Sequence, residues 1–130
     1  MINQFGCCAR YYKNAYKDDV LFAEDNGFSF LQLMYNNKRL LNKEVFMQAD
    51  EIKRIGFPGI LHACLDINEI EGHSNELMET VKYLGHKEVI LHPICRSEKI
   101  VDTTIFRLSK IVRNLLLTMK KEGISLFLEN

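Results

Sequence analysis

Four polar side chains occupy similar places near the ends of four apolar segments. They are Gln32, His62, His92 and Glu129. Imidazole nitrogens and carboxylate oxygens bind Zn²⁺, Mn²⁺ and similar ions, and a carboxylate can also take up or return a proton. If the fold brings the ends of these segments together, the residue types predict a site for a divalent metal, with Mn²⁺, Zn²⁺, Co²⁺ and Mg²⁺ as candidates.

The pattern of neighbouring residues places these groups on one face of a sheet. Side chains of a strand alternate between its two faces, so His62 and Cys64 share one face while Leu61 and Leu65 share the other. The other three segments alternate in the same way. One face is therefore predicted to be aliphatic and to pack under helices. The opposite face carries one polar residue per strand, and we expect these residues to lie at one level.

The helices and strands that must position these residues are predicted from segments whose hydrophobic residues repeat with the period of a strand or with that of a helix. Strand-like segments are predicted at residues 3–9, 28–35, 59–66, 88–93 and 124–129. Helical spacing is found at residues 18–26, 43–55 and 103–122, and a further helix is predicted to be capped by Ser74. A glycine follows each helix, at positions 27, 56, 85 and 123, which is typical of a helix C-terminus.

Strands that alternate with helices over short connections indicate an α/β protein with a parallel sheet, here (βα)4β in one domain spanning residues 1–130. Two architectures fit this order. The length of 130 residues favours a doubly wound, flavodoxin-like sheet. The polar groups near the strand ends favour the N-terminal part of a (β/α)8 barrel, whose active site lies at that end of the strands.

Composition narrows the class of protein. The chain has 17 basic and 17 acidic residues, which argues against nucleic-acid binding driven by overall charge. No apolar run approaches the roughly 20 residues that span a bilayer, and the N-terminus lacks a secretory signal. We therefore expect a soluble, cytoplasmic domain that makes no membrane contact. Its four cysteines form no CxxC pair and are expected to be reduced thiols.

Other polar residues receive weaker assignments. Tyr11, Tyr12 and Tyr16 follow the first strand and are candidates for the rim of a substrate site, with Tyr11 the one assigned to substrate binding. His73 and His86 stand beside glycines in polar surroundings, and both are expected to be exposed.

Three motifs together resemble a known superfamily. They are GILHACLDIN at 59–68, LGHKEVILHPI at 84–94 and EGISLFLEN at 122–130. In this order they resemble the xylose-isomerase-like TIM barrels, which include sugar and sugar-phosphate isomerases and epimerases and the endonuclease IV group. NGFSFLQLMYNN at 26–37 is similar to the second strand of that superfamily, where many members carry an acidic residue at the place of Gln32. The resemblance covers strands one to five of eight.

The resemblance implies roles for the polar residues. His62 and His92 match histidines that bind metal in the endonuclease branch and contact substrate in the isomerases. Glu129 matches a metal ligand that also serves epimerases as an acid/base carboxylate. Gln32, His62, His92 and Tyr11 are then candidate substrate contacts. The ligands that the superfamily takes from strands six to eight have no counterpart in these 130 residues.

The function implied is that of a sugar or sugar-phosphate isomerase or epimerase with metal-dependent proton or hydride transfer, incomplete in this chain. A non-catalytic half-barrel that serves binding or assembly is one alternative. An endonuclease IV-like phosphodiesterase is another, which the neutral charge disfavours. Because five barrel strands leave unpaired edges and an open inner face, a homo-oligomer is also predicted.

Overall fold

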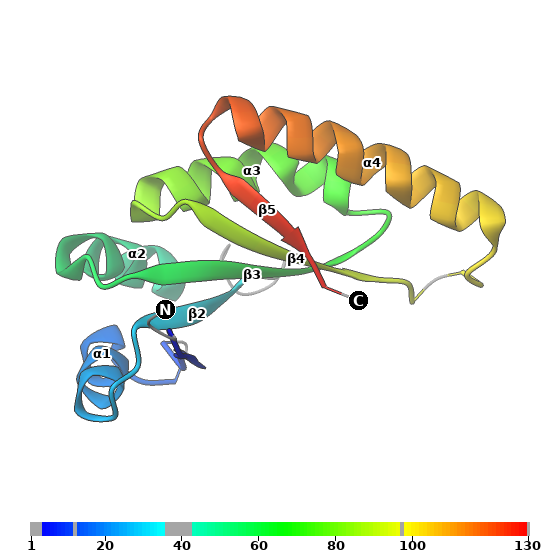
Figure 1. The fold of residues 1–130 in the computed structure, drawn as a ribbon. Coiled ribbons are helices and arrows are strands. Elements are labelled where there is room, and N and C mark those ends of the chain that lie inside the picture. Colours follow the sequence, from blue (N-terminus) through cyan, green and yellow to red (C-terminus); the bar gives the residue numbers. More distant parts are fainter. Residues whose placement is uncertain (1–3, 12, 36–42, 97, 130) are drawn as a thin grey trace.

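The computed structural model describes residues 4–11, 13–35, 43–96 and 98–129. Strands and helices alternate along the chain (Figure 1). The strands are β1 (Gly6–Cys8), β2 (Phe30–Tyr35), β3 (Gly59–Asp66), β4 (Glu88–Ile94) and β5 (Ser125–Leu128). The helices are α1 (Tyr16–Asp25), α2 (Lys43–Ile55), α3 (Ile70–Leu84) and α4 (Asp102–Lys121). The predicted α/β class is confirmed, with every predicted element present among these residues.

Local chemistry explains where the helices lie and end. In α4 the buried residues Ile111, Leu115 and Met119 recur every four positions, so one stripe of the helix packs on the sheet. The glycines at positions 27, 56, 85 and 123 all have φ between +68° and +76°. At Gly85 this left-handed conformation lets the backbone N–H bond back to the Lys82 carbonyl and close α3.

The five strands form one parallel sheet in the order β1-β2-β3-β4-β5. Neighbours in sequence are therefore neighbours in space. Figure 1 shows the helices along one side of the curved sheet, with the other side open. A doubly wound sheet reverses its strand order at a switch point and carries helices on both faces, so the flavodoxin-like alternative is wrong. The arrangement is that of part of a (β/α)8 barrel.

The core lies between the sheet and the helices. The aliphatic face predicted from alternation is buried in β2, β3 and β4, where its members are 0–1% exposed: Leu31, Leu33, Leu61, Ala63, Leu65, Val89 and Leu91. In β5 the pattern fails, since Leu126 is half-buried and Leu128 is 51% exposed. β5 is the edge of the sheet, so a helix or strand on its outer side is absent from the described residues.

Three predictions about polar residues are wrong. His73, expected to be exposed, is half-buried on α3. Ser74 does not cap α3, because the helix already begins at Ile70, and the Ser74 hydroxyl instead donates to the Glu71 carbonyl. His86 is buried rather than exposed, since the turn from α3 into β4 presses its ring against Gly59 at the start of β3. Burial lowers the pKa of His86, because the charged form loses its hydration. Among the described residues, no helix is long and apolar enough to cross a membrane.

Candidate metal centre

Glu129 joins the two predicted histidines. Its carboxylate Oε2 lies 2.7 Å from Nε2 of His62 and 3.2 Å from Nδ1 of His92. The backbone N–H of Glu129 donates to the Leu91 carbonyl over 2.9 Å, which continues the parallel ladder past the end of β5 and fixes this position. The two imidazole rings stack with centroids 5.8 Å apart and an interplanar angle of 15°. The three residues therefore meet in one cluster.

Gln32, the fourth predicted residue, joins the cluster by contacting His62. Its amide Nε2 lies 2.5 Å from Nδ1 of His62, so the amide donates to that ring nitrogen. A neutral His62 then carries its proton on Nε2 and donates it to Glu129. His62 is 8% exposed, and a buried imidazole of this kind needs both partners.

Cys64 also belongs to the cluster, as its alternation with His62 on one face indicates. Its Sγ lies 3.7 Å from Nε2 of His62, and one ligand atom from each of His62, Cys64 and His92 lies within 4.8 Å of the others. Burial, and next the nearby Glu129 carboxylate, raise the pKa of the Cys64 thiol. All four cysteines of the chain are free thiols.

The register shows that the cluster is assembled diagonally, which corrects the prediction of one common level. His92 pairs with Cys64, whereas His62 pairs with Ile90, and Gln32 pairs with Ile60. Gln32, His62 and His92 thus stand on successive steps across the sheet, while Glu129 follows Leu128, the partner of Leu91, and so lies level with His92. Strands of a barrel are tilted and staggered, so side chains on a diagonal come into contact. The contacts predicted from the strand ends form by this route.

An open cavity of about 470 Å³ lies beside the cluster on the inner face of the sheet. Its walls mix apolar side chains with Gln32, His62, Glu129 and Glu88. Glu88 also lines the cavity and is not among the predicted site residues. Its alternation with Ile90 and His92 on one face of β4 could have indicated that it points to the inner face. A hollow with apolar walls and convergent polar groups suits a small polar molecule.

The tyrosines after β1 lie elsewhere. Tyr11 is buried, and its hydroxyl donates to the Met34 carbonyl, so it does not line this cavity. Its predicted contact with substrate stays a prediction. Tyr16 is fully buried in the core, and burial, with Asp19 nearby, raises its pKa to about 12. Tyr12 lies outside the described residues.

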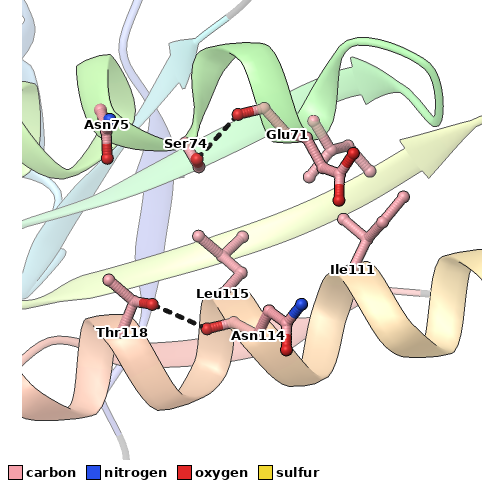
Figure 2. A pocket seen from close by; sticks show the side chains of 8 residues that line it. Glu71, Ser74, Asn75, Ile111, Asn114, Leu115 and Thr118 are labelled. Carbon is pink, nitrogen blue, oxygen red and sulfur yellow. Dashed lines mark hydrogen bonds between the residues drawn. The ribbon is translucent and has the colours of Figure 1, made fainter.

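A second cavity of about 270 Å³ lies between α3 and α4, on the helical side of the sheet (Figure 2). The hydroxyls that face it are already engaged: Ser74 donates to the Glu71 carbonyl and Thr118 to the Asn114 carbonyl. Ile111 and Leu115 form part of its wall. With its hydroxyls bonded within their own helices, this cavity offers less chemistry than the inner face.

The donor set of the cluster fits a divalent metal. Two imidazole nitrogens and a carboxylate oxygen from His62, His92 and Glu129 are ligands of Zn²⁺ and related ions. A metal-bound imidazole usually donates its second ring N–H to a polar acceptor. Gln32 stands at Nδ1 of His62, and a half-turn of its amide would place the amide oxygen there as that acceptor.

A parallel α/β sheet in sequential order, with helices along one face and a polar cluster on the other, is the architecture of part of a TIM barrel. Comparison with solved structures agrees with this architecture. The chain has the fold of part of the TIM barrels found in three solved structures, which confirms the expected fold. No protein-family model and no curated protein sequence matches the chain.

Three solved structures illustrate this likeness. An IolI protein crystallised with a bound zinc atom superposes with a TM-score of 0.69 at 20% identity, over 94% of this chain and 50% of that one. An L-ribulose 3-epimerase gives 0.68 at 14% identity, over 98% and 49%. A xylose isomerase domain protein from Planctomyces limnophilus gives 0.62 at 10% identity, over 98% and 52%. The chain therefore spans about half the length of these structures.

Proposed function

We propose that the protein is a metal-dependent domain of sugar isomerase or epimerase type, acting on a sugar or sugar phosphate. The observation that carries the proposal is the Glu129 carboxylate, 2.7 Å from one imidazole and 3.2 Å from another. This carboxylate lines the open cavity on the inner face of the sheet. The similarity to an L-ribulose 3-epimerase and to an IolI protein with a bound zinc atom supports the same proposal.

In this proposal His62, His92 and Glu129 hold the metal. A divalent ion held there would supply Lewis-acid polarisation of a substrate carbonyl and its neighbouring hydroxyl. Glu129 takes a proton from the carbon next to the carbonyl and returns it. Gln32 lines the cavity with an amide that can donate to substrate hydroxyls, and Ile60 and Phe127 form its apolar wall. His92 contacts the Glu129 carboxylate.

Proton exchange with solvent tests the proposed base directly. One carboxylate suffices to remove and return a carbon-bound proton, even where a complete epimerisation needs a second group. We expect the chain, loaded with Zn²⁺, Mn²⁺ or Co²⁺, to exchange deuterium from D₂O into the carbon beside the carbonyl of a ketose or ketose phosphate. Glu129→Gln should slow this exchange by about 100-fold or more, as expected for loss of a general base.

Glu122→Gln is the matched control, because that glutamate lies on the surface in an ion pair with Lys82. Calorimetry of metal binding provides the second readout. His62→Ala and His92→Ala should each weaken binding of the ion. A wild-type chain that binds none of the three metals would refute the proposal, and unchanged binding in His62→Ala would refute the assignment of ligands.

A further inference from the structure

Cys64 lies beside His62 and His92, close enough for its thiol to bind a metal that the two imidazoles hold. Its Sγ is 3.7 Å from Nε2 of His62, and it pairs in register with His92 on the neighbouring strand. The three ligand atoms lie within 4.8 Å of one another. Cys64 is half-buried on the inner face, on the same side of β3 as His62.

We infer that Cys64 is a thiolate ligand, so that His62, Cys64, His92 and Glu129 form a complete four-donor zinc site within this chain. The inference rests on the proposed metal site and extends it by one ligand and by the identity of the metal. No ligand from a further strand is then needed to fill a tetrahedron, although zinc can expand to five ligands when a substrate oxygen arrives.

The spacing of the donors supports a tetrahedral ion. With Zn–S near 2.3 Å and Zn–N near 2.0 Å, a tetrahedron separates sulfur from nitrogen by about 3.5 Å and nitrogen from oxygen by about 3.3 Å. The observed pairs are 3.7 Å for Cys64 with His62 and 3.2 Å for His92 with Glu129. The pair His62–Glu129, at 2.7 Å, is a hydrogen bond that must lengthen slightly as the ion replaces the shared proton.

A thiolate ligand also selects the metal. Sulfur is a soft donor that favours Zn²⁺ and Co²⁺, whereas Mg²⁺ and Mn²⁺ favour oxygen ligands and water. A site with one sulfur, two imidazoles and one carboxylate is therefore expected to prefer zinc to magnesium and manganese. Metal binding deprotonates the thiol, even though burial disfavours the thiolate in the metal-free site.

Cobalt spectroscopy tests the ligand without reference to activity. When the purified chain is titrated with Co²⁺, we expect intense visible bands of a tetrahedral ion and a near-ultraviolet charge-transfer band from thiolate sulfur. One equivalent of Zn²⁺ should abolish both. Cys64→Ser should lose the charge-transfer band and bind Zn²⁺ about tenfold more weakly or worse, with little change for Mn²⁺.

Cys95→Ser is the matched control, because Cys95 is also half-buried but its Sγ donates to the Glu98 carbonyl. It should keep the charge-transfer band. Alkylation of the wild-type chain gives a readout that does not depend on folding of a variant. Zn²⁺ should protect Cys64 from iodoacetamide more strongly than it protects Cys8, which is exposed, as measured by mass spectrometry of the peptides.

The outcomes separate this inference from the proposed function. Co²⁺ binding without a sulfur band, or a band that survives in Cys64→Ser, overturns the role of Cys64 and leaves the site of His62, His92 and Glu129 standing. Alkylation of Cys64 at the same rate with and without bound Zn²⁺ overturns it equally. A chain that binds neither Co²⁺ nor Zn²⁺ overturns both.

Discussion

At the scale of single residues, His62 is the centre of the site because both its ring nitrogens are engaged. Gln32 contacts Nδ1 over 2.5 Å, and Glu129 contacts Nε2 over 2.7 Å. With the amide N–H₂ on Nδ1, the ring proton stays on Nε2. A half-turn of the amide presents its oxygen to an Nδ1–H instead and frees the Nε2 lone pair for a metal. Gln32 thus decides which nitrogen carries the proton.

Substitution of Gln32 tests this positioning role. Gln32→Leu removes the acceptor for Nδ1–H, and we expect metal affinity to fall by about 10–100-fold, the usual effect of losing such a partner. Gln32→Glu restores an acceptor, and affinity should return at least to the wild-type value. Isothermal titration with Zn²⁺ measures both. Met34→Leu, on the same face of the same strand, is the control and should change little.

The cluster could be foreseen only in part from the sequence. Alternation placed His62, His92 and Glu129 on one face, and the structure brings them together. It could not supply the register, in which His92 stands opposite Cys64 while His62 stands opposite Ile90. Register depends on how β3 and β4 pair across the 21 residues of turn, helix and turn between Asp66 and Glu88, and no local pattern encodes that offset.

At the scale of elements, hydrophobic periodicity predicts the bounds of a helix or strand correctly where tertiary packing agrees with the local conformational preference. β3 and α2 have the predicted bounds, 59–66 and 43–55, because an apolar run or stripe ends sharply at each side. α3 shows the limit. Ile70 is fully buried and draws the helix start ahead of Ser74, although serine is by local preference a good cap. Tertiary burial outweighs a cap worth about 1 kcal/mol.

The burial of His86 is likewise set by a tertiary contact, and it leads to a prediction about the turn between α3 and β4. Its ring packs on Gly59, a residue distant in sequence, and its Nε2 has no hydrogen-bond partner among the described residues. Burial lowers its pKa from the ordinary value of 6.5. Below that pH the unfolded chain binds a proton that the native chain does not. The free energy of unfolding should therefore fall as pH decreases from about 6.5.

One such group contributes a slope of at most about 1.4 kcal/mol per pH unit. His86→Gln removes it, so the variant should lose less stability than wild type between pH 7.5 and 5.5. Urea unfolding at a series of pH values, with m-values checked for constancy, measures the difference. Equal slopes in the two proteins would show that the ring of His86 is not held neutral by the fold.

At the scale of the molecule, the sheet is open on one face and at β5. Phe127 and Leu128 are each 51% exposed. The neighbouring helix α4 adds further exposed apolar side chains, namely Ile105, Phe106, Leu116 and Leu117. In a closed barrel the next strand and helix would cover such a surface. An apolar patch beside an unpaired strand edge is a site of association.

This surface supports the proposal that the chain forms a homo-oligomer. In sedimentation at tens of micromolar we expect a mass at least twice 15.2 kDa. Leu128→Lys places a charge on the edge strand, where lysine opposes strand pairing, and should shift the population toward monomer. Tyr83→Ser removes a side chain of similar exposure, 44%, from the outer helix α3 and should leave the mass unchanged.

A wild-type monomer at this concentration would contradict the proposal, and equal effects of the two substitutions would point to general destabilisation. The result also bears on the metal site. If association covers the inner face, it removes water from the cavity beside Glu129 and strengthens every polar contact there. Zinc affinity should then rise with protein concentration through the dissociation range. Leu128→Lys should remove that dependence while leaving His62, Cys64, His92 and Glu129 in place.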